Sequence, residues 1–275
     1  MIETCHDEII RKNREIYSET SSIVWQVAVY GGLHGGWEFL NLGGSRALEI
    51  IAQSTGGIKG KRVLELCAGQ AAPARYLAHK YGCRVTAVEM NPGQVANARA
   101  RVAELDEETA ALVEIVEADV LSYEPSGAFD VVFSMDSAML IPDLPRLLEV
   151  SRRALRAGGR MELITIGAGP FMDEKTRAFA WDIDGMLSLL TMGEWTRLFE
   201  DAGFSAIHAE DITALAIENS KKLDAALLEN REEIERAEGR DTFLGWMNVG
   251  AAYLAAFSRG SLSYLHVSAS APGIM

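Results

Sequence analysis

The sequence predicts an α/β protein with a doubly wound, seven-stranded and mostly parallel sheet. Short apolar runs alternate with helical patterns from residue 63 onward. Such alternation is typical of βαβ units, whose strands lie parallel. The 275 residues, 48% of them hydrophobic, are enough to bury the core of such a domain. A helical pattern before the first strand and two long insertions after the fifth add a helical cap and helical lid segments.

The expected elements follow one another along the chain. Five strands are predicted over 62–66, 84–89, 112–117, 129–134 and 159–166. Helical patterns lie between them over 73–80, 92–105 and 143–156. Two later strands, near 206–212 and 261–268, complete the seven. In sheets of this kind ligands bind outside the carboxyl ends of the strands.

The helical additions define the expected domain organisation. Apolar residues in 6–29 recur at helical spacing, so residues 1–44 are predicted to form an N-terminal helical cap. The main domain is expected over 45–275, with lid insertions at 170–192 and 217–258. The second insertion is expected to be two helices joined around Gly239.

Charge and cysteine content exclude several classes of partner. The net charge of −13 opposes binding to a phosphate backbone, so no nucleic acid is expected. The three cysteines show no metal-ligand spacing, and reduced thiols fit a cytoplasmic protein without a metal. No apolar run approaches the roughly 18 residues of a membrane span. The acidic N-terminus has no signal-peptide core. The sequence leaves a homo-oligomer open.

The turn after the first strand carries the strongest functional signal. The strand ends with Glu65-Leu66, a turn follows, and Glu89 ends the second strand 20 residues after Gly69, where a ribose-binding acid stands in a Rossmann-like unit. NAD and S-adenosyl-L-methionine both satisfy this pattern. Glu65 would repel a pyrophosphate but suits the ammonium of a methionine. Of the three glycine positions of a dinucleotide fingerprint, two hold Cys67 and Ala72. S-adenosyl-L-methionine is therefore the better fit.

A set of motifs resembles the class I S-adenosylmethionine-dependent methyltransferases in order and spacing. The match covers about 45–212 and rests on Glu65 to Gly69, Glu89, Ala118-Asp119-Val120 and 155–160. The resemblance implies that the turn of Cys67, Ala68 and Gly69 holds the methionine part of the cofactor. Glu89 would then bind both ribose hydroxyls, Met90 would pack on the adenine, and Asp119 would accept from the adenine amino group. The other predicted cofactor-binding residues are Tyr17, Gln94, Val120 and Ser134. Cys67 departs from the family, which usually has glycine there.

The N-terminal segment resembles the cap of small-molecule methyltransferases that act on natural-product sugars, amines and phosphoethanolamine. Tyr17 stands on the leading helix, and His34 lies in the loop Leu33-His34-Gly35-Gly36-Trp37, at positions that match that cap. The resemblance implies a small organic acceptor and catalytic roles for Tyr17 and His34.

The segment after the fourth strand is expected to face the transferred methyl group. Related O- and N-methyltransferases often have histidine where Met139 and Leu140 stand here, and a histidine can act as general base towards a hydroxyl. Its absence disfavours O-methylation. Asp136 remains as a catalytic residue that orients an amine or hydroxyl or stabilises positive charge. The predicted substrate-binding residues are Trp37, Asp136, Met139, Leu140, Phe171, Trp181 and Trp246.

Together these expectations predict one favoured function and leave two alternative functions open. The protein is predicted to transfer a methyl group by in-line displacement to a small acceptor, with nitrogen or carbon favoured over oxygen. Positioning and desolvation alone are worth roughly 7–11 kcal/mol in such reactions. The first alternative is a cofactor-binding protein that acts as a cyclase or scaffold without methyl transfer. The second, less favoured, is a nicotinamide oxidoreductase.

Overall fold

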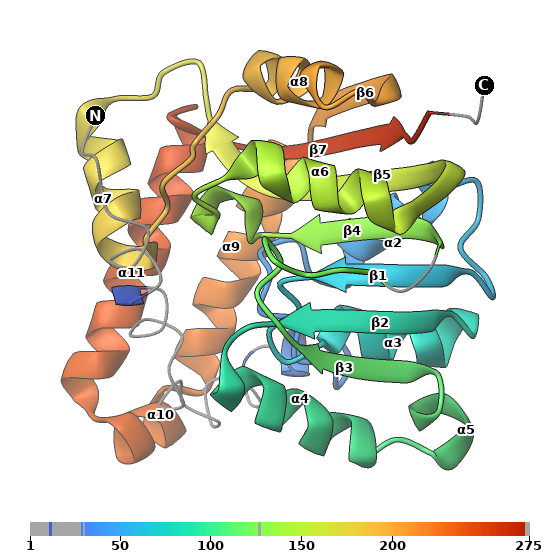
Figure 1. The fold of residues 1–275 in the computed structure, drawn as a ribbon. Helices are drawn as coiled ribbons and strands as arrows, with labels where there is room; N and C mark the ends of the chain where they lie inside the picture. Colours follow the sequence, from blue (N-terminus) through green and yellow to red (C-terminus); the bar gives the residue numbers. More distant parts are fainter. Residues whose placement is uncertain (1–10, 13–28, 30, 126–127, 273–275) are drawn as a thin grey trace.

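The sheet has the predicted number and direction of strands. The computed structural model describes residues 11–12, 29, 31–125 and 128–272. Its sheet has the order β3-β2-β1-β4-β5-β7-β6 (Figure 1). Neighbouring strands from β3 to β5 pair in parallel, whereas β7 is antiparallel to both β5 and β6. The strands are β1 Arg62–Leu66, β2 Arg84–Glu89, β3 Val113–Glu117, β4 Phe129–Met135, β5 Leu155–Ala168, β6 Ser205–Asp211 and β7 Leu262–Ser270.

Helices cover both faces of the sheet, and each face has its own hydrophobic core. Helices α2 and α3 lie over one face together with parts of α9 and α11. Helices α6 and α8 cover the other face. Helix α2, Gly44–Ser54, precedes β1, and the helices that follow parallel strands are α3 Ala72–Tyr81, α4 Pro92–Ala103, α5 Glu107–Ala110, α6 Leu144–Ala154 and α8 Met192–Asp201.

The alternation of side chains along β1 sets the direction of its acidic residue. Successive residues of a strand point to opposite faces. Val63 packs in the core under α2 and α3, and Leu64 and Leu66 pack in the core on the other face. Glu65 therefore shares the face of Val63 and lies at the beginning of α3.

The two insertions contain four helices. Helix α7, Glu174–Asp184, lies in the first insertion. The second insertion contains α9 Thr213–Glu229, α10 Arg231–Glu238 and α11 Arg240–Ser258. The expectation of two helices is wrong because the chain breaks twice, at Asn230 and at Gly239, where φ is +88°. Figure 1 shows α7, α10 and α11 beside the edge of the sheet to which the parallel strands point.

One strand boundary also differs from the prediction. Strand β5 begins at Leu155 rather than at residue 159, because Leu155 already pairs with Phe129 of β4. The pairing then shifts register, and Val131 of β4 lies opposite Arg160. Gly158, with φ of +69°, lies within this irregular part of the strand.

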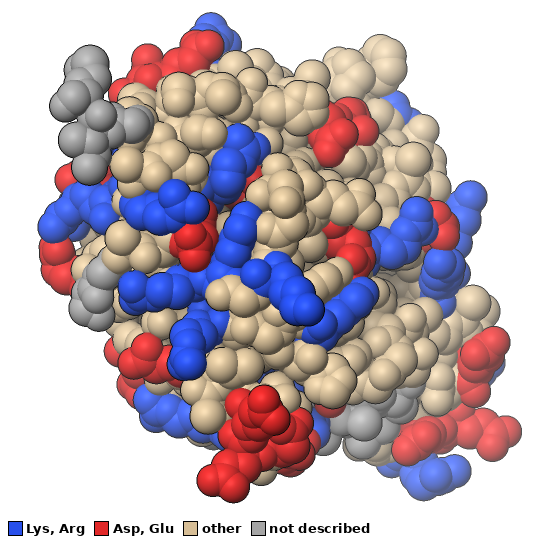
Figure 2. All heavy atoms as spheres, turned by 90° about the vertical axis from the view of Figure 1, so that its right-hand side faces the viewer, with Lys and Arg blue, Asp and Glu red and all other residues tan. Residues whose placement is uncertain are grey.

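Basic side chains gather at the end of the sheet away from the carboxyl ends of β1 and β2. Figure 2, which looks onto the side where the parallel strands begin, shows Lys and Arg side chains grouped there. Arg62 and Arg84 are the first residues of β1 and β2 and are register neighbours. Arg156 forms an ion pair of 2.6 Å with Asp130 on the same side. No helix in the described part of the chain has the length and apolar character needed to cross a membrane.

Candidate functional site

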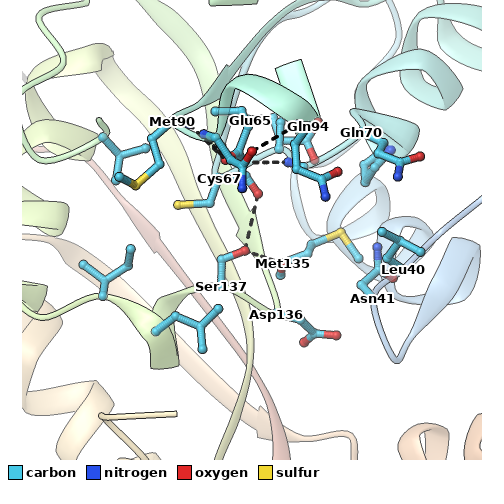
Figure 3. A pocket seen from close by; sticks show the side chains of 18 of the residues that line it. Leu40, Asn41, Glu65, Cys67, Gln70, Met90, Gln94, Met135, Asp136 and Ser137 are labelled. Carbon is cyan, nitrogen blue, oxygen red and sulfur yellow. Dashed lines mark hydrogen bonds between the residues drawn. The ribbon is translucent and has the colours of Figure 1, made fainter. Parts of the chain in front are cut away.

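A cavity of about 250 Å³ lies at the carboxyl ends of β1, β2 and β4 (Figure 3). Each strand contributes a residue from its last positions: Glu65, Glu89 and Met135. The loop before α2 closes another side with Glu38, Leu40 and Asn41. This is the edge of the sheet where the sequence predicts ligand binding.

The turn after β1 has an unusual backbone. Cys67, Gly69 and Ala71 have φ values of +58°, +54° and +56°, in the left-handed region. Glycine adopts this conformation without steric cost, whereas a residue with a Cβ does not. The conformation of Cys67 explains why glycine is the usual residue at this position. Burial and the nearby Glu89 carboxylate raise the pKa of the Cys67 thiol well above its ordinary value, so the thiol stays neutral.

Glu65 is a buried carboxylate that lacks one partner. Its exposure is 3%, and its Oε2 atom has no hydrogen-bond partner among the described residues. Burial raises the pKa of Glu65 well above its ordinary value, although the Ala74 amide and the charge of Arg75 oppose the shift. A buried carboxylate oxygen without a donor is costly. A cationic group in the cavity would supply both the missing hydrogen bond and the missing charge.

Glu89 connects the turns that follow β1 and β2. Its Oε2 accepts from the Gly69 amide at 2.9 Å, and its Oε1 accepts from the amides of Met90 and Asn91 at 3.0 and 2.8 Å. A carboxylate oxygen can accept more than one hydrogen bond. Glu89 therefore orders the cavity wall and retains lone pairs for hydroxyl groups of a ligand.

Asp119 follows β3 and lines the cavity. Its Oδ1 accepts from the Leu121 amide at 2.9 Å, which fixes the side chain in the turn. The second carboxylate oxygen remains as an acceptor for an amino group.

Asp136 follows β4 and is held by contacts from three directions. Its amide donates to the carbonyl of Ile164 at 2.9 Å, and its φ is +51°. Its Oδ2 accepts from the Leu42 amide at 2.6 Å and from the Tyr264 hydroxyl at 3.1 Å. Its Oδ1 is buried without a partner among the described residues. Burial raises the pKa of Asp136 to about 7.

The loop of residues 37–43 is held against α3 by buried charge. Glu38 Oε2 accepts from Arg75 at 3.0 Å, and both side chains are nearly inaccessible. The guanidinium of Arg75 also lies 5.6 Å from the ring centroid of Trp37. The Arg75 hydrogen bond lowers the pKa of Glu38 against the effect of burial. This contact places Leu40 and Asn41 on the cavity wall.

Most of the predicted cofactor residues lie together. The lining of the cavity includes Glu65, Cys67, Ala68, Gly69, Glu89, Met90, Gln94, Asp119 and Val120, and from the predicted acceptor residues Asp136 and Leu140. Ser134 does not line it, because its side chain is fully buried within β4. Tyr17 lies outside the described residues.

Several residues predicted to contact the acceptor lie elsewhere. Met139 is buried in the core, and Trp37 packs edge-on against Tyr76 at 5.5 Å between ring centroids. Phe171 is 70% exposed on the surface. Trp181 lies under the ammonium of Lys12, and Trp246 packs in a separate cluster formed by the lid helices.

His34 does not line this cavity but a second one beside it. Its ring packs edge-on against Phe39, with 5.5 Å between ring centroids, and contacts Gly44. Burial and the charge of Lys222 lower the pKa of His34.

The sequence did not reveal three further residues that line the cavity or contact Asp136. Asn41 and Ser137 line the cavity, and Tyr264 on β7 donates to Asp136. Ser137 is the residue after Asp136, and Asn41 comes shortly after the glycine-rich loop. Their closeness in sequence to predicted residues could therefore have indicated both. Tyr264 carried no local signal, because it reaches the site from an antiparallel strand 128 residues further along the chain.

Comparisons with known proteins give one family and several relatives. Residues 63–159 match the family model described as a methyltransferase domain. Sarcosine/dimethylglycine N-methyltransferase of Halorhodospira halochloris is 33% identical over 183 residues, which cover 64% of this chain and 61% of that protein. The 27-O-demethylrifamycin SV methyltransferase of Amycolatopsis mediterranei (strain S699) is 25% identical over 214 residues, with coverages of 74% and 76%.

The fold is also found in a solved structure. Phosphoethanolamine N-methyltransferase 2 of Haemonchus contortus, in complex with phosphomonomethylethanolamine and S-adenosylhomocysteine, superimposes with a TM-score of 0.82 at 22% identity. The match covers 94% of this chain and 60% of that chain. The chain thus spans about three fifths of the length of this protein and of the Halorhodospira relative.

Proposed function

We propose that this chain is a class I S-adenosylmethionine-dependent methyltransferase and that it transfers a methyl group to the nitrogen of a small amine. The observation that carries the choice of nitrogen is a pair of buried oxygens on residues that line the same cavity. Oδ1 of Asp136 and Oδ1 of Asn41 both lack a partner among the described residues, and both residues line the cavity. A hydroxyl donates one hydrogen bond, whereas a protonated primary or secondary amine donates two or more, so two unsatisfied acceptors favour an amine.

The residues present fit the cofactor. The buried Oε2 of Glu65 would accept from the ammonium of the methionine part. Glu89 would accept from the ribose hydroxyls while it keeps the Gly69 amide, and Asp119 would accept from the adenine amino group. When bound, S-adenosylmethionine supplies a methyl group activated by a positively charged sulfur.

Asp136 is the group that acts on the acceptor. An amine attacks through its unshared electron pair, so an ammonium must first lose a proton. With a pKa of about 7, Asp136 is partly ionised at neutral pH and can take that proton on Oδ1. The nitrogen–carbon bond then forms as the carbon–sulfur bond breaks, and the carboxyl group releases its proton to solvent. The apolar wall of Leu40 and Leu140 keeps water from the reacting atoms.

We propose that the acceptor is a small molecule and that the enzyme acts in the cytoplasm. The Halorhodospira and Haemonchus relatives are named for small amines, and the Amycolatopsis relative is named for 27-O-demethylrifamycin SV. The strongly negative charge of the chain argues against a nucleic-acid acceptor.

Methyl-labelled S-adenosylmethionine tests this proposal with a panel of secondary amines and the matching alcohols. We expect label on nitrogen and release of S-adenosylhomocysteine. Asp136→Asn should lower kcat by about 10²–10⁴, the usual contribution of a general base, with little change in affinity for S-adenosylhomocysteine. Asp201→Asn, an exposed carboxylate at the end of α8, is the control. Label on oxygen, or cofactor binding without any turnover, would support the alternatives instead.

A further inference from the structure

A second cavity, of about 100 Å³, borders the first because Asn41 lines both. Its polar lining is basic or neutral: His34, Arg46 and Lys222 with Asn41, Ser45 and Asn219. As far as the described residues go, no carboxylate lines it. A concave site with several donors and no carboxylate of its own favours an anion.

Arg46 and Lys222 lie at the exposed rim of this cavity, with side chains 56% and 52% exposed, and their charges are only partly neutralised. Glu218 pairs with Lys222 at 2.7 Å and also with Arg46, so one carboxylate balances two permanent cations. Glu218 does not line the cavity. The remaining positive charge acts on His34, because the charge of Lys222 adds to burial in lowering the pKa of that imidazole. The electrostatic field of Lys222 and Arg46 would also stabilise a negatively charged group of a ligand in this cavity.

The position of His34 is fixed by the backbone of α2. A Cβ on Gly44 would lie 2.0 Å from Cε1 of His34, so only glycine allows the ring to pack there. Gly44 also has a φ of +53°. The imidazole therefore packs directly against the backbone at the start of α2 and forms part of the cavity wall.

Leu42 joins this cavity to the proposed acceptor carboxylate. Its amide donates to Oδ2 of Asp136 at 2.6 Å, and its carbonyl accepts from Nδ2 of Asn219 at 3.0 Å. Leu42 and Asn219 both line the second cavity. Only Leu42 therefore separates Asp136 from the second, basic cavity, so a small molecule whose nitrogen contacts Asp136 would lie beside that cavity.

We propose that the second cavity binds an anionic group of the acceptor, a carboxylate or a phosphate, so that the substrates are small amines with a negatively charged group. This specificity rests on the proposed function, because it assumes that the amine lies at Asp136. Lys222 and Arg46 supply charge, and His34 and the amide of Asn219 line the wall that the anion contacts.

Calorimetry on the full chain saturated with S-adenosylhomocysteine tests this site, with acetate and inorganic phosphate as separate probes in an uncharged buffer. Lys222→Met should weaken binding of the preferred anion about twofold to fivefold, as expected for an ion pair with a half-exposed lysine. Lys221→Met, its exposed neighbour, should not. Glu218→Gln should tighten binding, because it removes the competing carboxylate. A damaged fold would not produce this gain.

Nuclear magnetic resonance of the His34 ring gives a readout that does not depend on turnover. A bound anion should raise the pKa of His34, because it offsets the charge of Lys222. The probe that binds tighter and gives the larger rise identifies a carboxylate or a phosphate site. If S-adenosylhomocysteine binds but neither anion shifts the His34 titration, the second cavity is not an anion site and the proposed methyl transfer stands. If S-adenosylhomocysteine does not bind, the proposed function itself is wrong.

Discussion

The hydroxyl of Tyr264 lies 3.1 Å from Oδ2 of Asp136 and accepts from the Gly43 amide at 3.0 Å. Tyr264 is fully buried on β7, so this hydroxyl connects the last strand, the loop before α2 and the carboxylate after β4. Burial and the neighbouring Asp136 raise the pKa of Tyr264 well above its ordinary value. The phenol therefore stays protonated and donates to the carboxylate.

Tyr264→Phe should shift the pH–rate profile. The Tyr264 hydrogen bond lowers the pKa of Asp136 against burial, so its loss should raise that pKa above about 7. Turnover at pH 7 should fall and recover at higher pH, since less Asp136 is ionised at neutral pH. Loss of the buried hydrogen bonds should also cost about 1 kcal/mol of stability. Tyr123→Phe, a half-buried tyrosine outside the cavity, is the control. An unchanged pH–rate profile would show that Tyr264 does not position Asp136 or influence its ionisation.

Glu65→Gln should stabilise the ligand-free protein at neutral pH. The folded-state pKa of Glu65 is raised above its ordinary value of 4.5, mainly by burial. The contribution of Glu65 to the free energy of unfolding is therefore fully present below about pH 4.5, and it is lost as the pH rises through the folded-state pKa. A neutral amide avoids that loss, with a gain on the order of 1 kcal/mol at pH 7. Thermal unfolding against pH measures this. A destabilised variant at pH 7 would show that Glu65 is already well satisfied without ligand.

Glu89→Ala should impair both cofactor affinity and local order. The substitution removes the acceptor of the Gly69, Met90 and Asn91 amides as well as the proposed ribose contacts. Charge-assisted hydrogen bonds contribute about 1.5–3 kcal/mol each, so S-adenosylhomocysteine should bind at least about tenfold more weakly. Glu117→Ala is a matched control, because Glu117 is the exposed register neighbour of Glu89 on β3. Equal affinities for both variants would exclude Glu89 from the ribose site.

His266→Gln should remove a pH-dependent part of stability without changing turnover. His266 is buried on β7 between Glu162 and Glu210, each 2.8 Å away. Burial lowers the pKa of His266, but the two carboxylates outweigh it and raise the pKa above 6.5. This stability is present below about pH 6.5 and is lost as pH rises through the raised value.

The variant should therefore lose about 2 kcal/mol near pH 6 and much less near pH 9. Denaturant unfolding at both pH values measures the difference. His208→Gln, on the exposed side of β6, should lose nothing at either pH. A loss independent of pH would mean that His266 is neutral in the folded protein.

The residues of the proposed cofactor site could be placed from the sequence because their signals are local. Glu65, Gly69 and Glu89 lie at the carboxyl ends of neighbouring parallel strands, so their positions in the sequence determine their positions in space. The apolar runs of β1 and β2 predicted those strands to the residue.

The acceptor half was less predictable because it depends on long-range packing. The contact of Leu42 with Asp136 joins residues 94 apart, and no local pattern indicates it. Aromatic residues of the lid also gave a misleading signal. Trp246 packs in a cluster with Phe243 and Ile234 of the second insertion, to which Val29 also belongs, and this cluster is separate from the two cores of the sheet. The helix break at Asn230, which creates the third helix, could not be predicted because no glycine or proline lies near it in the sequence.

Calorimetric titration of the wild type and of Glu65→Gln with S-adenosylhomocysteine and with NAD tests most directly whether this cavity is a methyl-donor site. The unpaired Oε2 of Glu65 predicts that S-adenosylhomocysteine binds the wild type, and that Glu65→Gln loses about 1.5–3 kcal/mol of this affinity. NAD should not bind either protein. Tighter binding of NAD than of S-adenosylhomocysteine, or equal S-adenosylhomocysteine affinity in the two proteins, would contradict the account.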